Sequence, residues 1–320
     1  MKEIFGKEKN IVIGMIHIYP TAEQVALALG YDSLNKDQLT QVSEFGTETM
    51  SEKGILEIET SLIDLAVKDA FILDSVGVDG LIIENYDFGY IALSPEEKSA
   101  GLVVPYKTHN HVVKLIEKTI HAVKEVTNKP IGINILTHDP KTNLEVADKN
   151  GCQFIQLDSV IGSYVGRKET SPEAMAELKQ KYSSVKVLGG VHPKYYERAI
   201  KIPDDVNSKE DLKDLFVKKD LLNLIDKTTE YSLVDMVVLT GDISGGHPPK
   251  NLKFVRDERP DLFIIAGSGV KVENVETQLK YANGLIVGSA FKEGGLQRGT
   301  PVSYGLSKKF MEAVYNSKQT

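Results

Sequence analysis

Side chains that can transfer protons stand at the ends of four short apolar runs. They are His17, Glu84, Asp158 and His192. Histidine and carboxylate groups act as general acids and bases when their surroundings tune their pKa values toward neutral pH. The same groups can bind one divalent metal ion. A hydrogen bond to a loop or a helix end would explain each of them equally well. Their shared position at run ends nevertheless predicts a polar pocket with acid/base chemistry.

Two further runs end in neutral polar residues, Asn134 and Thr240, which are suited to binding and orienting a substrate. Side chains alternate between the two faces of a strand, so Glu84 shares its face with Ile82, and Asp158 shares its face with Gln156. Unpaired polar groups inside a buried sheet would cost several kcal/mol. We therefore expect all these polar side chains to gather at one open end of the sheet.

Two glycine-rich turns near the end of the chain are candidates for a phosphate site. The first contains Gly267, Ser268 and Gly269, and the second contains Gly288 and Ser289. Glycine lets backbone N–H groups approach a ligand closely, and the start of a helix adds positive potential. Either turn could also be a tight connection without a ligand. Their occurrence after two consecutive apolar runs favours a phosphate cradle.

Four polar residues just beyond run ends are further candidates for contact with a ligand. They are Asn85, His138, Asp139 and Asp242. Asparagine, aspartate and similar residues also cap helices and close turns, and this alternative stays open for each of them.

Elements that position these residues can be predicted from hydrophobic patterning. Nearly continuous apolar runs rich in β-branched residues are typical of strands buried on both faces of a parallel sheet. Eight such runs occur, at residues 11–18, 78–85, 130–136, 153–158, 185–191, 234–240, 262–267 and 284–289. Segments with helical periodicity lie between most of them, at residues 56–76, 112–126, 173–182, 221–231, 273–281 and 304–315.

This alternation predicts an α/β protein, a single (β/α)8 TIM barrel over residues 1–320. An open doubly wound sheet is the alternative, but it usually has five or six strands. Extra length follows the first, second and fifth strands, at residues 19–52, 86–106 and 192–207. These long loops belong to the carboxyl-terminal face, where barrel active sites are built. Insertions without a role are the alternative.

Composition narrows the classes of function. The 320 residues carry 38 basic and 45 acidic side chains, a net charge of −7, which argues against a nucleic-acid or anionic-membrane partner. No apolar run is long enough to span a membrane. A single cysteine, Cys152, excludes an internal disulfide and indicates a reducing, cytoplasmic location. Cys152 precedes a strand at the opposite face, so we do not expect it to be a nucleophile.

Seven motifs, in order, resemble those of the BtpA/SgcQ family over nearly the whole chain. They cover residues 13–20, 77–87, 130–139, 154–162, 234–241, 264–275 and 282–295. The resemblance implies a barrel of the ribulose-phosphate-binding type. For function it implies less, because one branch of the family is named for photosystem I biogenesis and another is associated with carbohydrate-uptake gene clusters.

Two motifs depart from the family pattern. Where the family usually has Arg-Asn-Asp, this chain has Thr137, His138 and Asp139. Where the family usually has Phe-Ile-Arg-Val-Asn, residues 154–158 of this chain read Phe-Ile-Gln-Leu-Asp, with Gln156 in place of the arginine and Asp158 in place of the asparagine. Neutral glutamine cannot replace a fixed cation in a pocket. The departure argues against an identical substrate and against a photosystem role. Residues 21–53 are also longer than the segment usual in the family.

The sequence thus predicts an enzyme that acts on a phosphorylated sugar or a nucleotide-like small molecule. Lyase, isomerase and glycosyl- or phosphoribosyl-type chemistry are compatible with it. A Schiff-base aldolase is disfavoured, because no lysine was found near the carboxyl end of a strand. Alternatives are a non-catalytic assembly factor of the BtpA type and a metal-dependent hydrolase. The cofactor stays unknown, with a divalent metal as one option, and we expect a homo-oligomer.

Overall fold

Eight parallel strands close into a barrel in sequence order in this computed structural model, which describes residues 1–18, 52–85, 109–136, 139–162, 170–191, 210–240, 249–295 and 300–317. The strands are β1 (Ile11–Ile18), β2 (Gly80–Asn85), β3 (Ile131–Asn134), β4 (Phe154–Leu157), β5 (Lys186–Gly190), β6 (Met236–Thr240), β7 (Ile264–Gly267) and β8 (Gly284–Val287). Each strand lies within one predicted apolar run, so the predicted TIM barrel is confirmed. The long loops predicted after three of the strands fall almost wholly outside the described residues.

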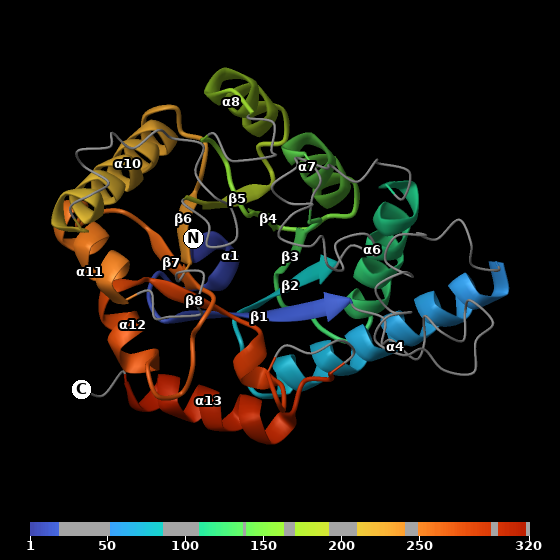
Figure 1. Cartoon of the computed structure of the whole chain (residues 1–320). Coiled ribbons are helices and arrows are strands. Elements are labelled where there is room, and N and C mark those ends of the chain that lie inside the picture. The colour runs from blue at the N-terminus through green and yellow to red at the C-terminus, as the bar shows by residue number, and fades with distance from the viewer. Residues whose placement is uncertain are drawn as a thin grey trace.

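Helices surround the strands as an outer ring (Figure 1). They are α4 (Glu52–Ser75), α6 (His109–Lys124), α7 (Pro140–Lys149), α8 (Pro172–Lys181), α10 (Glu210–Glu230), α11 (Pro249–Glu258), α12 (Val275–Tyr281) and α13 (Tyr304–Asn316). The sequence did not predict α7 or α11. In the described part of α11, the only fully buried apolar residues are Leu252 and Val255, too few to give a periodic signal.

The barrel interior is an apolar core closed at its amino-terminal end by a short helix, α1 (Lys2–Phe5). Phe5 packs edge-to-face on Phe154, with ring centroids 5.4 Å apart. Glycines make room for these two rings. A Cβ on Gly80 would lie 2.8 Å from the Phe5 ring, and one on Gly132 would lie 2.2 Å from the Phe154 ring. Because the centre is filled, a ligand can enter only at the carboxyl-terminal mouth.

A repeated pair of hydrogen bonds joins each odd strand to the following even strand at the amino-terminal face. In each pair, the residue just before the even strand donates its backbone N–H to the carbonyl of one residue of the odd strand. The backbone N–H of that odd-strand residue donates in return to the side-chain oxygen of the first residue. The four pairs are Val12–Asp79, Ile131–Gln153, Val187–Asp235 and Ile264–Asn283. The barrel is therefore a fourfold repeat of strand pairs at this face.

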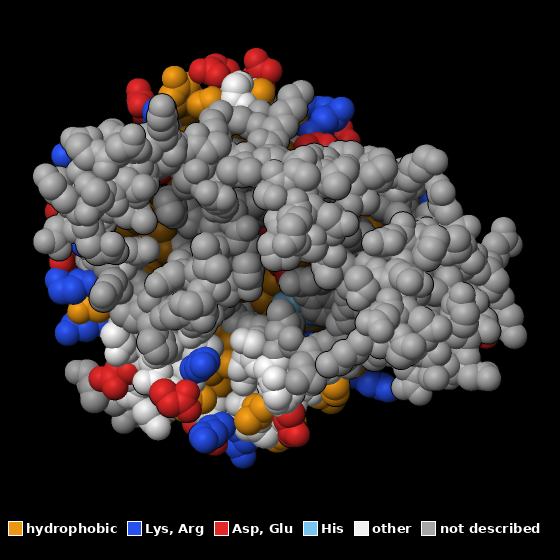
Figure 2. All heavy atoms as spheres, in the orientation of Figure 1, with side chains coloured by type: hydrophobic (Ala, Val, Ile, Leu, Met, Phe, Trp, Pro, Cys, Tyr) orange, Lys and Arg blue, Asp and Glu red, His pale blue; other side chains and the backbone are white. Residues whose placement is uncertain are grey.

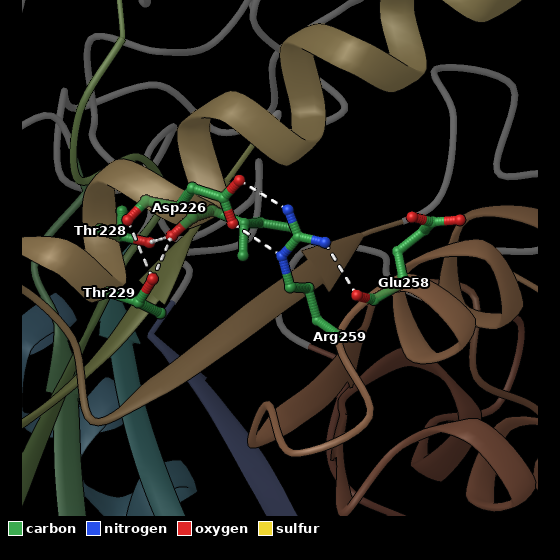
Figure 3. Close-up of polar contacts among 6 residues, drawn as sticks. Asp226, Thr228, Thr229, Glu258 and Arg259 are labelled. Atoms are coloured by element: carbon green, nitrogen blue, oxygen red, sulfur yellow. Dashed lines mark hydrogen bonds and ion pairs between the residues drawn. The ribbon is translucent and has the colours of Figure 1, made fainter.

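The side chain of Arg259 ties the end of α11 to α10 (Figure 3). Its guanidinium donates to both carboxylate oxygens of Asp226, at 2.7 and 2.6 Å, and to the carbonyl of Glu258. Thr229 donates to the Asp226 carbonyl at 2.9 Å. Both charged side chains are about a third or more exposed, so solvent weakens this pair, and its role is to align neighbouring helices.

Charged side chains of both signs and hydrophobic side chains alternate around the rim of the face shown in Figure 2. The described residues on this face do not gather into a patch of one sign. No helix in the described ranges is long and apolar enough to cross a membrane.

Candidate active site

Two carboxyl groups meet on one amide at the carboxyl-terminal mouth of the barrel. Asn134 ends β3 and pairs in register with Glu84 of β2. Its Nδ2 atom donates to Oε2 of Glu84 at 2.8 Å and to Oδ1 of Asp158 at 3.2 Å. Because one nitrogen donates to both, the two carboxyl groups lie side by side. Glu84 and Asn134 are buried and Asp158 is partly exposed, so the cluster faces the mouth through Asp158.

His17 of β1 extends this cluster to the other side. It pairs in register with Glu84, and its Nε2 atom lies 3.6 Å from Oε1 of that residue. Its imidazole also packs against Gly288, where a Cβ would lie 2.6 Å from the imidazole Cε1. His17 therefore connects the carboxyl pair to the second glycine turn. Glycine at position 288 is required for this close approach.

Burial controls protonation in the cluster. Burial and, to a smaller extent, the nearby charge of Asp158 raise the pKa of Glu84 to about 8, against the opposing effect of the Asn134 hydrogen bond. Burial also lowers the pKa of His17 to about 3, with a smaller contribution from the charge of Lys292. At neutral pH the cluster thus holds a protonated Glu84 beside a neutral imidazole.

The two predicted glycine turns follow adjacent strands, β7 and β8, which pair in parallel. Ser268 and Gly269 both adopt left-handed backbone conformations, with φ of 59° and 68°. The side chain of Asn274 closes this turn by donating to the Gly269 carbonyl at 2.8 Å and accepting the N–H of Lys271. A non-glycine residue rarely adopts this conformation, so the turn at Ser268 is strained.

The second turn leads into a short 3-10 helix, η2 (Ser289–Phe291). The first amides of a helix have no partner within it. Among the described residues no acceptor is found for the amides of Ser289 and Ala290. These two donors lie one and two residues beyond Gly288, which packs against His17.

The structure brings together His17, Glu84, Asn134 and Asp158, and it places the glycine turns beside them through His17. Thr240 ends β6, and its Cγ2 would lie 3.5 Å from a Cβ on Gly267 of the first turn. The predicted site residues His138, His192 and Asp242 lie outside the described residues.

Two loop candidates have structural contacts. Asp139 is exposed and caps α7, because its side chain accepts the N–H of Thr142 at 2.9 Å. Of the two interpretations left open for Asp139, the structure shows the helix cap. Asn85 is buried and accepts the N–H of Leu136 at 2.9 Å, which joins the ends of β2 and β3.

Cys152 is buried, and burial raises the pKa of its thiol to about 11. A thiol that stays protonated is a poor nucleophile. Within the described ranges, no group of three or more histidine, cysteine or carboxylate side chains is arranged to hold a metal ion. The described cluster therefore presents acid/base groups and no preformed metal site.

One buried charged pair near the mouth, formed by Lys292 and Asp69, is not among the residues predicted from the sequence. Lys292 lies five residues beyond the end of β8 and is 3% exposed. A signal was present, since Asp69 lies on the apolar face of α4 next to Ala70. A charged residue on a buried face needs a partner of opposite charge.

Comparison with known proteins gives the same result as the motifs. The sequence model of the BtpA family matches residues 8–316. The chain belongs to the BtpA family. An uncharacterized protein of Archaeoglobus fulgidus is 30% identical over 241 residues, which cover 74% of this chain and 85% of that protein.

Two other BtpA-family relatives carry names. The photosystem I biogenesis protein BtpA of Synechocystis is 27% identical, over 74% of each chain. The putative sgc region protein SgcQ of Escherichia coli is 23% identical, over 81% of this chain and 86% of that protein. The family resemblance predicted from the sequence is thereby confirmed.

Solved structures are similar to this chain at low sequence identity and with TM-scores below 0.5. N-(5'-phosphoribosyl)anthranilate isomerase from Pyrococcus furiosus is 13% identical with a TM-score of 0.45, over 96% of this chain and 100% of that chain. (S)-3-O-geranylgeranylglyceryl phosphate synthase from Thermoplasma acidophilum is 12% identical with a TM-score of 0.48, over 96% and 94%. These likenesses concern the fold alone.

Proposed function

We propose that this BtpA-family barrel is an enzyme that transfers a proton within a small phosphorylated substrate, a sugar phosphate or a nucleotide-like molecule. The observation that carries the proposal is the single Asn134 amide shared by Glu84 and Asp158, together with the raised pKa of Glu84. A carboxyl group with a perturbed pKa at the carboxyl-terminal end of a barrel is characteristic of an acid/base site.

Glu84 is the proton donor in this proposal, because its pKa of about 8 keeps it protonated at neutral pH. Asp158 is the more exposed carboxyl group and is placed to accept a proton or to stabilise positive charge on the substrate. Neutral His17 is the hydrogen-bonding group that orients the substrate between Glu84 and the second glycine turn.

The phosphate group is assigned to the glycine turns after β7 and β8. The amides of Ser289 and Ala290 are free donors among the described residues, and Gly288 brings this turn against His17. Backbone amides can bind an anion without a lysine, which agrees with the acidic net charge of the chain. A phosphate here would hold the substrate on the side of His17 opposite Glu84.

A non-catalytic assembly role is the second candidate. The Synechocystis relative, a photosystem I biogenesis protein, favours it by its name. In that case neutral replacements of Glu84 and Asp158 would leave the biological activity intact.

A thermal-shift screen with paired compounds tests the proposal. Each sugar phosphate is compared with the same sugar without phosphate, on the wild type and on Gly288→Ala. We expect at least one phosphorylated compound to stabilise the wild type, by about 2.7 kcal/mol at 100 times its dissociation constant, and its free sugar to have a much smaller effect. If no phosphorylated compound stabilises the wild type, the assignment of the phosphate site is refuted.

The matched control is Gly305→Ala on α13, where nothing lies closer than 4.0 Å to the added Cβ. This variant is expected to bind like the wild type, whereas Gly288→Ala is expected to bind more weakly because its Cβ would displace His17.

A further inference from the structure

A buried ion pair lies behind the second glycine turn. Lys292 follows η2, and its side chain is 1% exposed, while that of Asp69 on α4 is fully buried. The Nζ atom of Lys292 donates to the Thr300 carbonyl at 2.6 Å and lies 3.6 Å from Oδ2 of Asp69. The other oxygen of Asp69 accepts the backbone N–H of Val302 at 2.8 Å. Asp69 thus contacts both ends of the segment from Lys292 to Val302.

Backbone contacts close the base of the same segment. Lys292 and Val302 form an antiparallel bridge, and the N–H of Ser303 donates to the Phe291 carbonyl at 2.8 Å. Phe291 is fully buried and packs edge-to-face on Phe310 of α13, with centroids 5.3 Å apart. The end of η2 is therefore fixed between α4 and α13.

Asp69 is held in place by the packing of α4 against the barrel. It belongs to the face of α4 that packs on the barrel, and Leu73 of that face lies 2.9 Å from where a Cβ on Gly14 of β1 would be. Lys292 also donates its backbone N–H to the Ser289 carbonyl at 3.2 Å. A continuous chain of contacts thus runs from β1 through α4 and the ion pair to the turn at Ser289.

Burying two charges has a desolvation cost, and apolar residues of similar size are often at least as stabilising. A buried ion pair is therefore explained better by a positioning role than by its contribution to stability. Here the pair joins α4 to a turn whose amides at Ser289 and Ala290 have no acceptor among the described residues. The charge of Lys292 also reaches the site, since it contributes to the lowered pKa of His17.

We propose that Asp69 and Lys292 are positioning residues that hold the turn at Ser289 and Ala290 in the conformation that binds an anion. We call this pair, with its contacts to Thr300 and Val302, the 69–292 latch. The proposal rests on the proposed function for its ligand, a phosphate group, but the geometry of the latch can be tested without any ligand.

The test uses full-length variants that remove one charge or both: Asp69→Asn, Lys292→Met and the double variant. Each single variant leaves one buried charge unpaired, so we expect a clear loss of thermal stability. The double variant removes both charges while Asn keeps an acceptor for Val302. We expect it to recover much of the stability, which keeps the test open if a single variant does not fold.

Two readouts separate positioning from general stability. Hydrogen exchange at the amides of Lys292, Gly295 and Ser303 is expected to be roughly tenfold faster in the double variant than in the wild type. Binding of inorganic phosphate, followed by phosphorus NMR, is expected to weaken roughly tenfold to a hundredfold, as when a group that orients a ligand contact is removed. The control removes the more exposed pair Glu59–Lys118, which also starts from α4 and has side chains 13% and 51% exposed, and it should change neither readout.

The outcomes are distinguishable. Wild-type exchange and wild-type phosphate affinity in the double variant would overturn the latch. If the wild type itself binds no phosphate, the phosphate assignment fails, and the exchange result alone decides whether the latch holds the turn. Faster exchange with unchanged phosphate affinity would also overturn the proposal, because the latch would then have no part in binding.

Discussion

Glu84 is the residue whose environment most clearly departs from that of an ordinary surface side chain. Its carboxyl group is buried, faces the charge of Asp158 and lies 3.6 Å from a histidine that cannot readily take up a proton. Only the Asn134 amide favours the ionised form. The residue is therefore kept protonated at neutral pH at a cost to stability, which is a common feature of functional carboxyl groups.

Replacing Glu84 by glutamine should remove a pH-dependent loss in the free energy of unfolding. The native pKa of about 8 lies above the ordinary value of 4.5. As pH rises from about 4.5 to about 8, the unfolded wild type releases this proton while the folded protein keeps it, so the wild type loses stability. We expect Glu84→Gln to gain relative stability over this range, on the order of a few kcal/mol in total.

Urea unfolding at several pH values measures this difference. The control is Glu57→Gln, the same exchange of residue types at an exposed position of α4. A stability difference for Glu84→Gln that does not change with pH would contradict the buried, protonated carboxyl group.

Gly288 is predicted to be sensitive to substitution because it packs against His17. An added Cβ would lie 2.6 Å from the imidazole of His17, so the ring must shift from its position beside Glu84. We expect Gly288→Ala to destabilise the fold by about 1–3 kcal/mol and to shift the histidine resonances in NMR spectra. Unchanged resonances for His17 would show that the ring does not pack on this glycine.

Elements of this barrel could be predicted because their signals are local. Continuous apolar runs predicted all eight strands, and helical periodicity over residues 173–182 predicted α8, whose N-cap Ser171 accepts the N–H of Ala174. The first turns of α10 were missed. Among its residues 214–220, whose side chains the structure describes, none is buried, so no apolar stripe marks that part of the helix.

The repeated strand pairs at the amino-terminal face predict where stability resides. Asp79 accepts the N–H of Val12 at 2.7 Å and forms an ion pair with Lys7 at 2.7 Å. Asp79→Ala leaves that N–H without its acceptor, so we expect a loss of about 1–3 kcal/mol in the free energy of unfolding. Ligand binding at the opposite face should stay unchanged.

Asp79→Asn keeps a side-chain oxygen at this position and serves as the matched variant. It should lose less stability than Asp79→Ala in urea unfolding. Equal losses would mean that the ion pair with Lys7, and not the hydrogen bond to Val12, carries the effect.

At the scale of the whole molecule, the site was predictable in outline because closing a parallel sheet brings strand ends together. That argument placed Glu84, Asn134 and Asp158 at one mouth. It could not show that one amide joins the two carboxyl groups, because this depends on side-chain conformation. The contact of Asp69 with Lys292 was also hidden, since no sequence spacing relates α4 to the segment after β8.

The homo-oligomer stays a prediction. Light scattering of the purified protein should give a mass of at least two chains. A mass of one chain at high protein concentration would contradict it.

The central claim is that the mouth binds a phosphate next to an acid/base cluster. A crystal structure of the protein soaked in inorganic phosphate tests it most directly. We predict a phosphate bonded to the amides of Ser289 and Ala290, on the side of His17 away from Glu84. Empty turns after β7 and β8 at high phosphate concentration would contradict the account.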